Sequence, residues 1–119
     1  MMMFRIAWWL LFVSTSLFAL NHVIGAATFA TSGDETVMFL IFAALNLLTL
    51  VVLLEPYRDR ERWAWWAVWI PIAAMFVGPL VFGLGPITVI YCVGGAVMAA
   101  AHLMAARQML RTRASLRRG

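Results

Sequence analysis

The chain has no lysine, a single cysteine and few charged residues of either sign. Charged residues make up 12% of its 119 positions, hydrophobic residues make up 65%, and the mean hydropathy is +0.93. These proportions exclude a water-soluble domain. The lone Cys92 can form neither an intrachain disulfide nor a paired-thiol metal site, so we expect it to be a small packing residue. The composition predicts an integral membrane protein.

The motifs of hydrolytic enzymes are also missing from the sequence. It contains no Ser-x-x-Lys, no Gly-x-Ser-x-Gly, no clustered carboxylates and no histidine-rich metal motif. Small multidrug exporters have a similar length and four spans, but they depend on a glutamate in the first span, and the first span here has no acidic residue. We therefore predict no catalytic residue, no enzyme activity, no cofactor or metal, and no proton-coupled export of that kind.

Four hydrophobic stretches are each long enough to cross a bilayer, which takes roughly 20 apolar residues per helix. Short breaks separate the stretches, and no linker domain or internal repeat interrupts them. The sequence predicts a single all-α membrane domain over residues 1–119, an up-down bundle of four transmembrane helices. We place the spans and the basic tail at residues 6–30, 36–55, 63–83, 86–107 and 108–119.

All nine arginines fall on the side of the membrane shared by both termini and the middle connection. The positive-inside rule then predicts that both termini are cytoplasmic. Arginine used without lysine is typical of GC-rich bacterial genomes, which favours a bacterial inner membrane. The basic tail is expected to attract anionic lipid at about 1 kcal/mol per arginine. No nucleic-acid partner is needed to explain these charges.

The tryptophans gather near the same boundary. Indole rings prefer the headgroup region, where the ring is shielded and its N–H stays hydrated. We expect five interface anchors, with a tryptophan-lined binding site as the alternative: Trp8, Trp9, Trp63, Trp65 and Trp66.

The middle connection, residues 55–62, alternates acidic and basic side chains and is expected to be a solvated loop. The segment Glu61-Arg62-Trp63-Ala64-Trp65-Trp66 that ends it resembles the hairpin of small uncharacterised bacterial four-span membrane proteins. The resemblance covers this short segment only. It implies a bacterial four-span membrane protein and assigns no activity.

Small residues recur four apart in the fourth span, a spacing that lets helix backbones approach closely in lipid. They are Gly95, Ala96, Ala99 and Ala100. The packing partner of this face, either another helix of the chain or a second subunit, stays open. The third span contains Pro71 and Pro79, which shape the helix or open a hinge.

Polar residues inside the hydrocarbon are the default candidates for function. His22 and His102 lie in opposite halves of the bilayer, roughly 15 Å apart in depth at ~1.5 Å per residue, which argues against shared ligation of one metal or haem. The outer half also holds further polar side chains, and their expected role is either interhelical hydrogen bonding or ligand binding. The candidate ligand site consists of Asn21, His22, Asn46 and Tyr91.

Two functional hypotheses follow. The favoured one is a non-catalytic packing or accessory subunit of a bacterial inner-membrane assembly, with a homo-oligomer or another membrane protein as partner. The alternative is a binder or carrier of a small lipophilic molecule inside the bundle.

Overall fold

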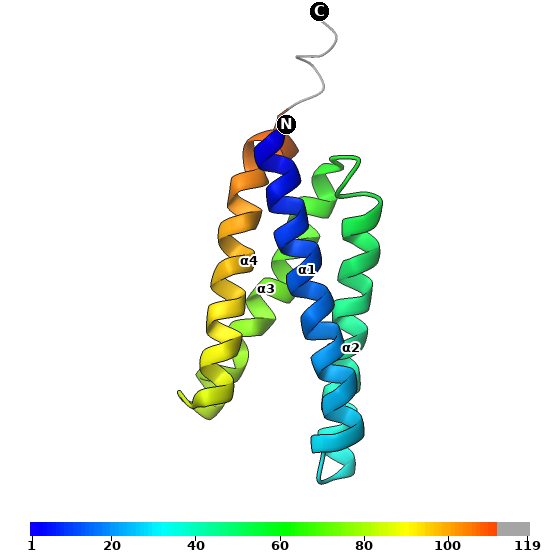
Figure 1. Cartoon of the computed structure of the whole chain (residues 1–119), viewed down its shortest axis with the longest axis vertical. Coiled ribbons are helices and arrows are strands. Elements are labelled where there is room, and N and C mark those ends of the chain that lie inside the picture. Colours follow the sequence, from blue (N-terminus) through cyan, green and yellow to red (C-terminus); the bar gives the residue numbers. More distant parts are fainter. Residues whose placement is uncertain (112–119) are drawn as a thin grey trace, which may run out of the picture.

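Four long helices make up the computed structural model, which describes residues 1–111 and is all-helical over that range (Figure 1). Each helix is long and apolar enough to span a membrane, which confirms the prediction of an all-α protein with four candidate spans. The first helix continues without a break into a short π-helix, η1. The elements are α1 (Met2–Ile24), η1 (Gly25–Phe29), α2 (Gly33–Leu54), α3 (Arg62–Phe82) and α4 (Pro86–Leu110).

The helices alternate in direction, so the two ends of the bundle differ in chemistry. The N-terminus, the 55–61 connection and the end of α4 lie at one end, which we call the arginine end (Figure 1). The opposite end, which we call the turn end, holds the 30–32 and 83–85 connections. The described arginines all belong to the arginine end: Arg5, Arg58, Arg60, Arg62, Arg107 and Arg111.

Local chemistry explains where the helices at the turn end start. Ser32 caps α2 by accepting a hydrogen bond from the Glu35 N–H at 3.2 Å, and the Glu35 carboxylate accepts the Thr31 N–H at 2.7 Å. This reciprocal pair satisfies backbone donors that the first turn leaves free. Gly83 has a φ of 75°, a conformation that favours glycine, and Pro86 opens the first turn of α4.

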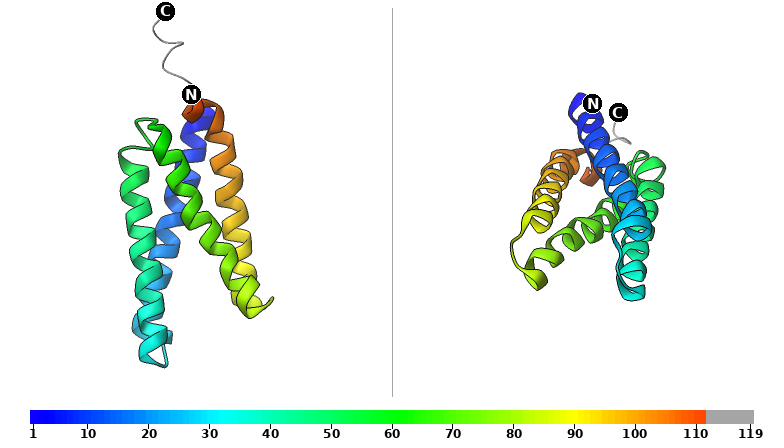
Figure 2. Two further views of the ribbon diagram at one scale, coloured as in Figure 1. Left: turned by 180° about the vertical axis from the view of Figure 1, so that it is seen from behind. Right: turned by 60° about the horizontal axis from the view of Figure 1, so that its bottom comes forward.

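The four helices pack as two hairpins that separate toward the turn end. α1 packs along both α2 and α4, and α3 packs along α4, whereas α2 meets α3 less extensively. Figure 2 shows α3 leaving α2 near the arginine end and running diagonally toward α4. Pro71 and Pro79 lie inside α3 and each removes one backbone donor.

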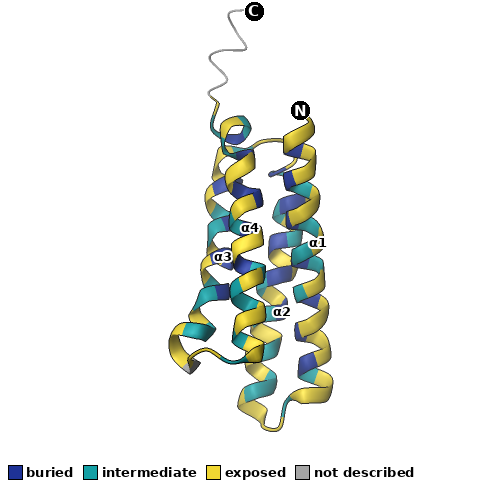
Figure 3. Ribbon diagram, turned by 60° about the vertical axis from the view of Figure 1, so that its left-hand side comes forward, coloured by how far each residue is buried: buried dark blue, intermediate teal, exposed yellow. Residues whose placement is uncertain are grey.

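Buried side chains concentrate in the arginine half of the bundle (Figure 3). The hydrophobic core joins the first turns of α1 to the last turns of α4, with Leu53, Tyr57 and the start of α3 between them. The turn half has fewer buried apolar residues, and its polar residues form a separate cluster.

Candidate functional site

His22 is the centre of a polar cluster in the turn half. Its Nδ1 lies 2.9 Å from Asn46 Nδ2 on α2, and its Nε2 lies 2.8 Å from the Tyr91 hydroxyl on α4. Asn21 Nδ2 donates to the same hydroxyl oxygen at 3.3 Å. His22 and Asn46 are buried, whereas Tyr91 is half-buried and Asn21 is exposed. The structure therefore brings together all four residues of the predicted ligand site, from three helices.

The hydrogen bonds of Asn46 favour one tautomer of His22. Asn46 Nδ2 donates one N–H to the Phe42 carbonyl at 2.9 Å, and a carbonyl can only accept. The second N–H of that nitrogen points to His22 Nδ1, which therefore accepts and carries no proton. In a neutral imidazole the proton is then on Nε2, which donates to Tyr91.

Aromatic rings surround the imidazole of His22. Phe42 stacks on it at 5.3 Å between ring centroids, and Tyr91 stacks at 5.7 Å. Phe18 stacks on Tyr91 at 5.5 Å with an interplanar angle of 25°. The rings and the amide of Asn46 together fix the position of His22. His22 contacts the Tyr91 hydroxyl but does not itself line the neighbouring cavity.

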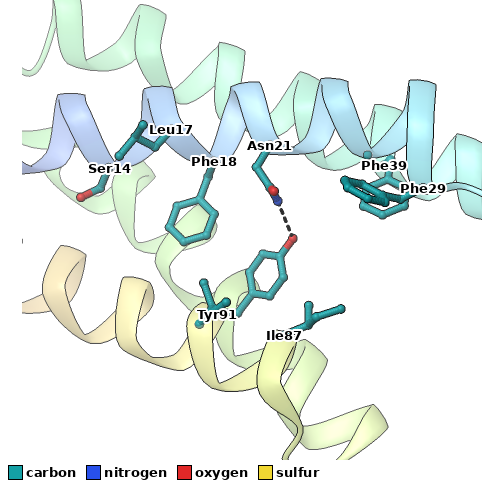
Figure 4. A pocket seen from close by; sticks show the side chains of 10 residues that line it. Ser14, Leu17, Phe18, Asn21, Phe29, Phe39, Ile87 and Tyr91 are labelled. Carbon is teal, nitrogen blue, oxygen red and sulfur yellow. Dashed lines mark hydrogen bonds between the residues drawn. The ribbon is translucent and has the colours of Figure 1, made fainter.

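A cavity of about 550 Å³ lies beside this cluster, between the two hairpins (Figure 4). Its polar edge is formed by Ser14, Asn21 and Tyr91. The remaining wall is apolar: Leu17, Phe18, Gly25, Phe29, Phe39, Ile87 and Ile90. The volume is in the range of small-molecule sites, which are mostly apolar with a few placed polar groups.

Two glycines let aromatic rings pack at the wall of the cavity. A Cβ on Gly25 would lie 2.6 Å from Phe39 Cε1, and a Cβ on Gly94 would lie 2.4 Å from Phe18 Cζ. Both distances are shorter than van der Waals contact, so any side chain would displace the ring. Gly25 therefore lets the Phe39 ring of α2 lie against η1, and Gly94 lets the Phe18 ring of α1 lie against α4.

A second histidine cluster lies in the arginine half, and it is closed. His102 Nε2 donates to the Trp65 carbonyl at 2.9 Å, and His102 Nδ1 then accepts from the Tyr57 hydroxyl at 2.9 Å. The Trp65 ring stacks on the imidazole at 4.8 Å, and Trp69 contacts it edge-on at 4.9 Å. Tyr57 and His102 are both 0% exposed. This cluster joins α3, α4 and the 55–61 connection.

The structure corrects the expectation of a wholly solvated middle connection. Tyr57 stacks on Phe4 at 6.0 Å and is completely buried. Arg60 lies over the Phe4 ring at 5.0 Å. The sequence signal for this burial was Tyr57, the one aromatic residue among the alternating charges, and the sequence-based prediction did not use it.

The expected interface anchors divide into two groups. Trp9, Trp63 and Trp66 are exposed near the arginine end, as an anchor requires. Trp65 is 6% exposed and stacks on His102, so its assignment as an anchor is corrected to a core residue. Trp8 is half-buried and donates its indole N–H to the Leu53 carbonyl at 2.7 Å.

The small residues of α4 also divide between the inside and the outside of the bundle. Gly95 is buried against Phe76 and Met75, and Ala99 is half-buried. Ala96 and Ala100 are exposed on the surface of the monomer, so no other helix of the chain covers them. The candidate tail at 108–119 continues α4 to Leu110, and its part beyond residue 111 lies outside the described residues.

Residues 1–111 contain no group of three or more His, Cys, Asp or Glu side chains arranged to hold a metal ion. Comparison with known proteins adds no family: no family model, no curated protein and no solved structure matches the chain.

Proposed function

We propose that this multi-pass membrane protein binds a small lipophilic molecule in the cavity between its two hairpins. The carrying observation is the cavity of about 550 Å³, with an apolar wall and a polar edge at Asn21 and Tyr91. An apolar molecule reaches such a site from the bilayer, and the polar edge orients it. We propose a non-catalytic role, because the polar groups that line the cavity are one amide and two hydroxyls.

Native mass spectrometry of the protein released from membranes in mild detergent tests this proposal. The unmodified protein is expected to retain a lipophilic adduct. Ile90→Trp places a large ring in the cavity wall and is expected to remove the adduct. Leu103→Trp is the matched control, because Leu103 is similarly exposed on the same helix and lies away from the cavity. An equal adduct in both variants, or none in the unmodified protein, contradicts the proposal.

A second candidate function is that of an accessory subunit in a bacterial inner-membrane assembly. The observation that favours it is the exposure of Ala96 and Ala100, four residues apart on α4, which offers a close approach to another helix. Size-exclusion chromatography with light scattering distinguishes a monomer from an oligomer or a complex. Ala96→Leu is expected to dissociate an oligomer or a complex, whereas a strictly monomeric, partner-free protein contradicts this role.

Both proposals place the arginine end in the cytoplasm. The clustering of the described arginines there supports this orientation. In a Cys92→Ala background, a membrane-impermeant maleimide added to intact cells is expected to label Ser32→Cys at the turn end and to leave Arg58→Cys unlabelled. The reverse pattern contradicts the orientation.

A further inference from the structure

The polar edge of the cavity has two hydrogen-bond donors, one on Tyr91 and one on Asn21, for which no acceptor is found among residues 1–111. The Tyr91 oxygen receives the Nε2–H of His22 and an N–H of Asn21, so both contacts use it as an acceptor. Its own hydrogen then has no acceptor among residues 1–111. Asn21 is exposed on the cavity wall and has a second amide N–H. Donors left without partners in an apolar setting favour a ligand that supplies an oxygen.

The charge around the cavity favours an uncharged ligand. None of the ten residues that line the cavity is ionisable except the Tyr91 hydroxyl. The charged residues nearest along the chain at the turn end are Asp34 and Glu35, both acidic. The arginines belong to the opposite end, and none occurs between Arg5 and Arg58 or between Arg62 and Arg107. An anionic head would leave water without gaining a positive partner.

The shape of the wall indicates where the rest of the ligand lies. Figure 4 shows Phe18 on one side of the Asn21–Tyr91 bond and Phe29 with Phe39 on the other. Leu17 and Ile90 are more than half exposed, so the wall continues onto the lipid-facing surface. A ligand with its oxygen at Tyr91 can therefore extend hydrocarbon chains sideways into the bilayer.

We propose that the ligand is an uncharged lipid whose head carries a carbonyl or ester oxygen, and that this oxygen accepts the Tyr91 O–H. This inference rests on the proposed lipophilic binding function and narrows its ligand class. The Asn21 amide is the second donor, and His22 is a positioning residue that keeps the Tyr91 oxygen occupied and its hydrogen turned toward the cavity.

Three probes that differ in their heads test the inference on the full chain in detergent. Dioleoylglycerol has neutral ester oxygens, dioleoyl phosphatidic acid adds a phosphate to the same chains, and squalene has no oxygen. Native mass spectrometry titrations are expected to give dioleoylglycerol the tightest binding. Tyr91→Phe is expected to weaken dioleoylglycerol roughly three- to tenfold, the value of one neutral hydrogen bond, and to leave squalene unchanged.

Two further variants accompany Tyr91→Phe, the first as a control and the second as an additional test. Tyr57→Phe removes a hydroxyl from the closed cluster and is expected to leave all three probes unchanged, because Tyr57 does not line the cavity. Asn21→Leu changes an exposed residue and is expected to weaken dioleoylglycerol less than Tyr91→Phe. It keeps the test available if Tyr91→Phe does not fold.

Failure of this inference is distinguishable from failure of the proposed function. Equal binding of dioleoylglycerol and phosphatidic acid, or a Tyr91→Phe protein that binds dioleoylglycerol like the unmodified chain, overturns the head-group assignment. If Ile90→Trp still abolishes binding in that case, lipophilic binding stands. Absence of binding for all three probes overturns both.

Discussion

The bundle contains two histidine–tyrosine pairs of similar geometry in different surroundings. At the arginine end, Tyr57 and His102 meet at 2.9 Å, are 0% exposed and are enclosed by Trp65 and Trp69. In the turn half, Tyr91 and His22 meet at 2.8 Å, and the tyrosine edges a cavity. The same pair is thus a structural link where helices converge and part of a candidate site where they diverge. Surroundings, more than residue type, separate structure from function here.

The largest effect is expected from His102→Ala, which breaks the closed cluster. The variant removes a buried ring and leaves the Tyr57 hydroxyl and the Trp65 carbonyl without their partner. We expect a loss of about 2–4 kcal/mol in the free energy of unfolding. Titration with sodium dodecyl sulfate, followed by circular dichroism, measures it. Leu103→Ala, at the exposed neighbour, is expected to lose far less, and equal losses contradict a structural role for His102.

Replacing Gly94 or Gly95 with alanine is expected to have the next largest effect on the free energy of unfolding. The two variants test both regions of the bundle, the hydrophobic core and the cavity. A Cβ on Gly95 would lie 2.9 Å from Phe76 Cε2, and a Cβ on Gly94 would lie 2.4 Å from Phe18 Cζ. Each alanine variant is expected to cost about 1–3 kcal/mol by overpacking. Gly94→Ala should also push Phe18 into the cavity and weaken ligand binding.

Gly78→Ala is the control for these variants, since nothing lies within 4 Å of a Cβ built there. Thermal unfolding in one detergent compares all three. If Gly78→Ala destabilises the protein as much as Gly94→Ala does, close ring packing is not the cause.

Removing the Tyr57 hydroxyl in one variant and the Tyr91 hydroxyl in another compares the two histidine–tyrosine pairs directly. Tyr57→Phe leaves a completely buried imidazole nitrogen without its donor, and we expect a loss of about 1–2 kcal/mol. Tyr91→Phe leaves the Nε2–H of the buried His22 without its acceptor, but it does so beside a cavity, and we expect a smaller loss of about 0.5–1 kcal/mol. Unfolding of both variants under identical conditions provides the test. A larger loss for Tyr91→Phe reverses the assignment of roles.

The smallest effect is expected from alkaline pH. Burial raises the pKa of the Tyr57 hydroxyl, which lies in the connection outside the spans. The folded protein then keeps this proton while an unfolded tyrosine releases it near pH 10, so stability falls as pH rises above about 10. Melting temperatures between pH 8 and 11 are expected to fall more steeply for the unmodified protein than for Tyr57→Phe. Parallel slopes contradict the claim.

Hydropathy was sufficient to predict the helices, because a lipid environment leaves a chain of this composition few alternatives. The grouping of Asn21, His22 and Tyr91 was also predictable, since their depth places them in the outer half of the bilayer, with Asn46 near its middle. The burial of Tyr57 and Trp65 was not predictable in this way, because it depends on how the connection folds back over Phe4 and how far α3 rotates. The separation of the hairpins was not predictable from the sequence either, because it depends on the direction in which α3 runs away from α2.

The unequal length of the two hairpins affects the surrounding lipid. With η1 included, the helices of the α1–α2 hairpin have 28 and 22 residues, whereas those of the α3–α4 hairpin have 20 and 25, so the shortest span is the third, at about 30 Å for ~1.5 Å per residue. The uncharged turn at 83–85, which joins α3 to α4 and in which Leu84 is 81% exposed, stops short of the α1–α2 turn (Figure 1). Lipids beside the shorter hairpin must thin or tilt to match it. The bilayer is therefore expected to be thinnest beside the α3–α4 turn.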